Sequence, residues 1–167
     1  MSSIIKVDQI QLADGSTPTA GDLGINTTGN IIQVVTFNYT GGEQGITSTS
    51  DASTPYTLNI TPKFADSTIL VMASFPIRKN TGTTDDGATI SLYRDSTRVK
   101  DKWTFIWGYN LVSSSGMFGQ FAAQYPDTPN TTSEITYTVK LRTVAGGDFR
   151  VGDSSSGGQL TAFEIAG

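Results

Sequence analysis

The sequence predicts an all-β fold: an antiparallel β-sandwich, with a jelly roll as the first choice and an immunoglobulin-like sandwich as the second. In most segments after residue 30, apolar and polar residues alternate at the two-residue period of a strand. Turn-forming residues interrupt these segments about every ten positions, as in sandwich proteins. No segment carries a sustained helical period, which argues against a parallel α/β sheet.

Composition narrows the classes of function. The chain has 167 residues, which is enough for one core-forming domain and an extension. It contains no His and no Cys, so the commonest general base, thiolate nucleophiles and disulfides are all missing. We therefore expect a protein that is not an enzyme, with no catalytic residues, no cofactor and no metal site.

Charge and hydropathy exclude two kinds of partner. The net charge is -4 at pH 7 and no basic stripe is present, so nucleic acid is not an expected partner. No apolar run approaches the length of a membrane-spanning helix. The first residues lack the basic start and the long apolar stretch of a signal peptide. The sequence predicts synthesis in a cytoplasm and no membrane insertion.

Residues 1–30 differ from the β-domain expected at 31–167. Their large aliphatic residues punctuate a polar segment and are Ile4, Ile5, Val7, Ile10 and Leu12. A flexible tail and an extended arm that orders only against a partner both fit this pattern. The regular spacing favours the arm, with these five side chains as its attachment contacts. Residues 16–24 are expected to hold at most one short helical turn.

The domain is predicted to begin with two strands, at 31–37 and 56–61. A loop rich in Gly, Ser and Thr, residues 40–53, separates them. Pro62 ends the second strand because proline cannot donate to a sheet ladder.

The segment from Ser67 to Asp95 is the centre of the predicted fold. Residues 69–77 are almost continuously apolar, as in a strand buried on both faces. Residues 88–93 alternate, and the tip between the two runs is rich in turn-forming residues. We therefore expect an antiparallel hairpin here.

The remaining strands follow from the same alternation. They are expected at 102–110, 117–125, 135–142, 149–151 and 160–165, for a total of eight to ten strands. Pro126 and Pro129 are expected to end the second of these.

Acidic residues are the remaining candidates for chemistry. Asp85 and Asp86 could bind calcium together with Asp148 or Asp153, although a solvated acidic turn is the simpler interpretation. Glu164 lies between two apolar residues, so it faces solvent or is buried with a partner. The sequence places no two carboxylates together, as a paired-acid glycosidase would need.

One predicted strand is unusually aromatic. Trp103, Phe105, Trp107 and Tyr109 fall on one face at a period of two. Three interpretations fit them: the sandwich core, an intersubunit interface, and a platform on which a glycan stacks.

Short motifs in this chain resemble one family. The opening from Ile5 to Gly15, IKVDQIQLADG, resembles an arm that precedes a β-domain in virion structural and tail-fibre proteins of marine phages, especially cyanophages. The resemblance continues in scattered motifs over nearly the whole chain, at Ile60–Phe64, Ser67–Val71, Leu92–Ser96, Asp127–Pro129 and Phe163–Gly167.

The resemblance implies a virion protein assembled in the cytoplasm of a bacterial host. It implies a C-terminal jelly roll similar to tumour-necrosis-factor and C1q domains, which usually form homotrimers. The arm would attach to other phage tail, baseplate or capsid proteins, and the β-domain would point outward for host attachment, with a surface glycan as a candidate ligand. No shaft repeats are present, so a short tail fibre or appendage is expected. The alternatives are a free carbohydrate-binding module or lectin, and a capsid decoration protein.

Overall fold

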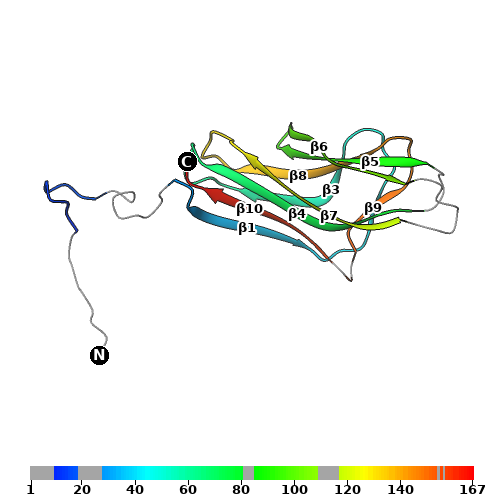
Figure 1. The fold of residues 1–167 in the computed structure, drawn as a ribbon, viewed down its shortest axis with the longest axis horizontal. Coiled ribbons are helices and arrows are strands. Elements are labelled where there is room, and N and C mark those ends of the chain that lie inside the picture. Colours follow the sequence, from blue (N-terminus) through cyan, green and yellow to red (C-terminus); the bar gives the residue numbers. More distant parts are fainter. Residues whose placement is uncertain (1–9, 19–27, 81–84, 109–116, 154, 156) are drawn as a thin grey trace, which may run out of the picture.

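The structure is a computed structural model that describes residues 10–18, 28–80, 85–108, 117–153, 155 and 157–167. All the regular structure in these residues is β, as ten strands that form two antiparallel sheets packed face to face (Figure 1). This confirms the predicted all-β sandwich. Within the same residues, no helix is long and apolar enough to cross a membrane.

Sheet A is built around one long central strand, β4 (Thr68–Lys79). On one edge β4 pairs with β10 (Gly158–Ile165) and then with β9 (Phe149–Val151), and on the other with β7 (Met117–Asp127). The sheet is completed by β1 (Ile31–Tyr39) beside β10 and by β2 (Gln44–Ile46) beside β9. Sheet B has the order β3 (Ala52–Ile60), β8 (Ile135–Thr143), β5 (Asp86–Arg94) and β6 (Thr97–Gly108).

The connectivity is that of a jelly roll. When the two three-residue strands β2 and β9 are set aside, eight strands remain in chain order. Sheet A takes the first, eighth, third and sixth of them, and sheet B takes the second, seventh, fourth and fifth. Two interlocked Greek keys produce this order, so the first choice from the sequence is the observed topology.

The predicted central hairpin is wrong, because β4 and β5 lie in different sheets. β4 pairs with β10, β9 and β7, whereas β5 pairs with β6 and β8. β4 and β5 are therefore not the two arms of one hairpin. The expectation that the first of these strands is buried on both faces is also wrong, because residues of β4 alternate between buried and half-buried or exposed positions, whereas β5 is buried on both faces over most of its length.

Other boundaries differ in smaller ways. The loop predicted at 40–53 contains the short strand β2, and β6 begins at Thr97, several residues earlier than expected. β7 continues through Pro126 to Asp127. Proline is tolerated there because β7 pairs only with β4, so its other edge needs no backbone donor.

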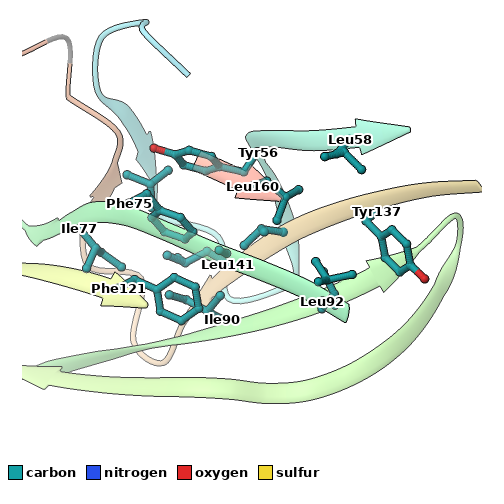
Figure 2. Close-up of a cluster of buried hydrophobic side chains, with 14 of the residues drawn as sticks. Tyr56, Leu58, Phe75, Ile77, Ile90, Leu92, Phe121, Tyr137, Leu141 and Leu160 are labelled. Atoms are coloured by element: carbon teal, nitrogen blue, oxygen red, sulfur yellow. The ribbon is translucent and has the colours of Figure 1, made fainter. Parts of the chain in front are cut away.

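The core lies between the sheets and is aromatic at its centre (Figure 2). The ring of Tyr56 from β3 stacks on Phe75 from β4, with centroids 4.2 Å apart. Phe75 also meets Phe121 from β7 at 4.6 Å. Successive strand residues point to opposite sides, so the apolar residues that alternate along β3, β4, β5 and β8 all reach this core.

Candidate interaction surfaces

The N-terminal segment joins the sandwich beside the C-terminal residues. The N–H of Gly29 donates to the carbonyl of Ala166 at 2.9 Å, and the N–H of Ala166 donates to the carbonyl of Asn30 at 2.9 Å. The hydroxyl of Thr28 donates to the carbonyl of Gly167 at 3.2 Å. These bonds fix where the arm leaves the domain, at the end that carries the C-terminus (Figure 1).

Two of the five predicted attachment residues are described, and both are exposed. Ile10 and Leu12 are 51% and 38% exposed. Leu12 belongs to a tight turn, in which the N–H of Gly15 donates to the Leu12 carbonyl at 2.9 Å and Gly15 has a φ of 84°. Side-chain and backbone hydrogen bonds from Ser16 lower the pKa of Asp14 in this turn. Ile4, Ile5 and Val7 lie outside the described residues, as does most of the predicted helical turn.

The aromatic strand β6 is divided between two surfaces, so the prediction that its aromatic residues share one face is wrong. The indole N–H of Trp103 donates to the carbonyl of Gln124 at 3.0 Å. Its ring meets Phe121 at 5.4 Å, edge to face. Trp103 therefore fills the seam between β6 and β7, at the side of the core.

Phe105 and Trp107 lie on the outer face of sheet B. They pair across the sheet with Thr89 and Gly87, while the intervening Ile106 packs on the core. The two rings lie 5.6 Å apart, tilted by 37°. Phe105 is 53% exposed. Tyr109 lies outside the described residues, and the role of these aromatic residues as interface or glycan contacts stays a prediction.

A β-bulge separates Trp103 from the other two rings. The register between β5 and β6 shifts between Ile90 and Leu92. Opposite this shift, Lys102 has a φ of 47°, in the left-handed region that ordinary residues rarely adopt. Four steps along β6, from Lys100 to Thr104, lie opposite two steps along β5, so β6 carries two extra residues here and simple alternation fails at this point.

Gly87, which no sequence pattern indicated, allows the rings of Phe105 and Trp107 to pack close to β5. A Cβ atom on Gly87 would lie 2.4 Å from Cε3 of Trp107 and 3.0 Å from Cζ of Phe105. Only glycine lets both rings lie this close to β5. The sequence gives no sign of this contact, because the pairing of residues 87 and 107 depends on the bulge.

A network of charged residues occupies the rest of this outer face. The carboxylate of Asp51 accepts from the hydroxyl of Tyr93 at 2.6 Å and from the guanidinium of Arg142 at 2.7 Å. It also pairs with Arg98 at 3.3 Å, and Arg142 reaches Asp101 at 3.2 Å. Five residues from distant parts of the chain thus neutralise one another.

The network shifts the pKa values of its members. Burial acts to raise the pKa of Asp51, but hydrogen bonds from Tyr93 and Arg142 outweigh it, and the pKa lies below its ordinary value. The same hydrogen bond raises the pKa of Tyr93, whose ring also carries the ammonium of Lys140 at 4.1 Å. The carboxylate is thus held ionised as a partner for cations, not as a proton carrier.

Of the acids considered for calcium, Asp86 has a structural role. Asp86 is fully buried, and its carboxylate accepts the N–H groups of Gly87 and Ala145 at 2.7 Å each, and that of Gly147. A solvated turn is therefore the wrong interpretation for Asp86, which instead ties β5 to the loop after β8. Within the described ranges, no cluster of three or more acids forms a possible metal site.

Glu164 is buried with partners, which decides between its two interpretations. One carboxylate oxygen accepts from the backbone N–H of Lys63 at 2.7 Å, that of Phe64 at 3.1 Å and the hydroxyl of Ser67 at 2.8 Å. The other accepts from the amide of Gln33 at 2.6 Å. This single side chain holds the loop between β3 and β4 against β1 and β10.

Comparisons with known proteins give similarity only to solved structures. No protein-family model matches the chain, and no curated protein matches its sequence. The structure of infectious bursal disease virus strain Gx matches with a TM-score of 0.49 and 10% identity, over 100% of this chain and 37% of that chain. The T13 particle of the same virus matches with a TM-score of 0.43 and 10% identity, over 99% and 40%. Dimeric latent PorU from Porphyromonas gingivalis matches with a TM-score of 0.35 and 12% identity, over 78% and 13%.

The chain thus spans at most 40% of the length of these solved chains. At such identities and TM-scores, the similarity carries no argument about function. The class of the protein rests on its own topology, which is that of a jelly-roll β-sandwich.

Proposed function

We propose that this chain is a non-enzymatic virion structural protein of a phage, a short tail-fibre or appendage subunit. Residues 1–30 attach it to another tail, baseplate or capsid protein, and residues 31–167 form a homotrimeric jelly roll. One observation carries the proposal: the arm leaves the sandwich beside the C-terminal residues with its described aliphatic side chains exposed. The motifs that resemble marine phage proteins support the same assignment.

The proposed function requires attachment and adhesion, and no chemical step. Aliphatic side chains of the arm contribute about 1.5–3 kcal/mol each at most when a partner covers them. A trimer presents three copies of each outward surface, so contacts that are weak singly add to useful adhesion through avidity. The buried carboxylates of Asp86 and Glu164 are engaged with backbone N–H groups, which suits a structural role better than acid–base chemistry.

The test is deletion of residues 1–27, which keeps the hydrogen bonds made by residues 28–30. We expect the truncated protein to keep its cooperative unfolding transition and its strand content, because none of residues 10–18, the described part of the deleted segment, belongs to the core. Produced in infected cells that lack the wild-type gene, it should be missing from purified particles. A full-length Ile10→Asp/Leu12→Asp variant tests the side chains themselves. Normal incorporation of the truncated protein would refute the attachment role.

A second candidate is a free carbohydrate-binding module or lectin, and the exposed ring of Phe105 favours it. Aromatic rings with polar neighbours stack well on sugars, and the charged network of sheet B begins beside this ring. Saccharide binding by the jelly roll without its arm, removed by Phe105→Ala with the fold unchanged, would favour this candidate. A capsid decoration protein would share the attachment arm but bind the shell instead of the tail.

A further inference from the structure

The outer face of sheet A contains no charged residue over most of its area. Side chains alternate along β4, so Ile69, Val71 and Ala73 enter the core and the residues from Thr68 to Pro76 between them point outward. None of these outward residues is Asp, Glu, Lys or Arg, and neither is any residue paired with them on β10, β1 or β7. We call this surface the neutral face.

Register places apolar side chains in one row of the neutral face. Val34, Phe163, Leu70 and Pro126 lie side by side across four strands. Val34 is 52% exposed, and Met72 in the row beyond is 40% exposed. Methionine, aromatic and aliphatic residues without charges are typical of the centre of a protein–protein interface.

The polar side chains of the neutral face largely pair with each other. The amide of Gln159 donates to the Asn38 side chain at 3.0 Å, and the amide of Gln120 donates to the Ser74 hydroxyl at 3.0 Å. Hydroxyls of Thr36 and Thr161 lie 3.3 Å apart. Covering this face with a partner therefore leaves few polar groups without hydrogen bonds, which lowers the cost of removing water.

The fold itself does not require such a face. Sheet B presents an outer face of similar extent, and there Asp51, Asp101, Arg98, Arg142 and Lys140 gather. The two outer faces differ in chemistry although both belong to the same sandwich. The difference indicates that one face meets solvent and the other meets a surface that excludes charge.

From these observations we infer that the neutral face is the surface through which copies of this chain assemble, an inference that rests on the proposed homotrimer. Each copy carries a net charge of -4, so association is opposed unless the contact brings no like charges together. A neutral surface satisfies this condition for a second copy. An open hollow of about 360 Å³ beside Met72, Ala122 and Gln124 accommodates side chains of the neighbour.

The size of the neutral face favours a closed ring over a two-fold pair. Four strands and the residues from Thr68 to Pro76 define an area of about 19 by 26 Å, or about 500 Å² in projection. Each partner in a standard stable interface buries about 800 Å². In a ring, each copy contributes this face to one neighbour and a different patch to the other, so the buried area per copy increases.

The first test uses the full chain in light scattering. We expect a mass near three chains for the wild type. Met72→Glu and the isosteric Gln124→Glu should each weaken association by about tenfold or more, because a buried unpaired carboxylate is strongly unfavourable. Gln11→Glu, the same change at an exposed position outside the neutral face, is the matched control and should leave the mass unchanged. Thermal unfolding verifies that each variant is folded.

The second test uses the absence of native cysteine. Ser74→Cys lies on the neutral face and Ser53→Cys on the outer face of sheet B, and both serines are exposed within one chain. We expect maleimide to label the cysteine at position 53 rapidly and the one at position 74 slowly, with equal rates once Gln124→Glu is added.

Three results would overturn the inference: a monomeric wild type, an oligomer that Met72→Glu and Gln124→Glu leave intact, or equal labelling in the oligomer. A monomer in which a saccharide or another phage protein protects position 74 would reassign the face to that partner. A monomer that still enters particles through its arm would overturn the interface and leave the attachment role standing.

Discussion

At the residue scale, buried carboxylates do more for this fold than its ion pairs on the surface. Asp86 and Glu164 are both fully buried, and each accepts backbone N–H groups of a neighbouring loop. A carboxylate removed from water is tolerated only when donors surround it. Each residue therefore fixes a neighbouring loop through directed hydrogen bonds.

Replacing Glu164 by Gln is expected to destabilise the protein. Gln33 donates to one carboxylate oxygen and three donors meet the other, so the new amide N–H₂ must face at least one donor. The free energy of unfolding should fall by about 1–3 kcal/mol, measured by urea denaturation. Glu134→Gln, at an exposed position, is the matched control and should change it by less than about 0.5 kcal/mol. Equal effects at the two sites would show that the Glu164 contacts are dispensable.

At the element scale, β6 shows how one bulge redirects a whole strand. Lys102 adopts a positive φ, and Trp103 follows it within the irregular stretch and lies in the seam beside β7. Regular pairing resumes at Thr104, and from there Phe105 and Trp107 face outward. Because of the bulge, one strand places Trp103 at the side of the core and also presents the exposed pair Phe105 and Trp107. The two functions share one strand because the period is broken between them.

The bulge predicts opposite effects of two substitutions at position 102. Lys102→Gly should leave the free energy of unfolding unchanged or raise it by up to about 1 kcal/mol, because glycine adopts a positive φ without strain. Lys102→Val should lower it by about 1–3 kcal/mol, since a β-branched residue is strained there. Both values come from chemical denaturation. Equal stability of the two variants would mean that β6 relaxes to a regular register.

At the scale of the whole molecule, the sandwich separates a core, a charged face and a neutral face. The core is continuous between the sheets, with Tyr56, Phe75 and Phe121 at its centre (Figure 2). Charge gathers outside sheet B and is missing from the neutral face of sheet A, whereas the far end of sheet A carries the ion pairs of Arg78 and Arg150 with Glu43. Residues 28–30 are bonded to the C-terminal residues at one end of the sandwich, away from the centre of either outer face (Figure 1).

Stability of the whole molecule should decline at both ends of the pH scale. The pKa of Asp51 in the folded state lies below its ordinary value near 4, so its contribution is present above that pH and is lost as the pH falls further. Burial raises the pKa of Tyr56, and burial with a hydrogen bond to Asp127 raises that of Tyr137. Their contribution is present below about pH 10 and is lost as the pH rises above it.

Urea denaturation across the pH range measures the decline of stability at acid pH and at alkaline pH. Asp51→Asn should flatten the decline of stability at acid pH, and it should also reduce the part of the alkaline decline that comes from Tyr93, because the hydrogen bond to Asp51 raises the pKa of that tyrosine. Absorbance of tyrosinate near 295 nm should show two tyrosines that ionise only when the protein unfolds. Ionisation of all tyrosines in the folded protein would contradict the burial of Tyr56 and Tyr137.

Alternation along the chain was enough to predict the fold class and most strands. A two-residue period fixes which side chains share a face, so the inner residues of β4 and β8 could be identified from the sequence. Composition alone likewise showed that no candidate function could rest on a His or Cys side chain, because the chain contains neither residue. Spacing predicted Ile10 and Leu12 as attachment residues; both are exposed in the structure, and their role as contacts stays a prediction.

The tertiary structure decided which strands are neighbours. Alternation carries no information about pairing partners, so β4 and β5 were assigned to one hairpin although they belong to different sheets. The partners of Asp86 and Glu164, the contact between Gly87 and Trp107, and the neutral face all join residues far apart in the chain. The sequence determined which side chains share a face of each strand. Only the packing of the two sheets determined what each face contacts, because those contacts join segments that are far apart in the chain.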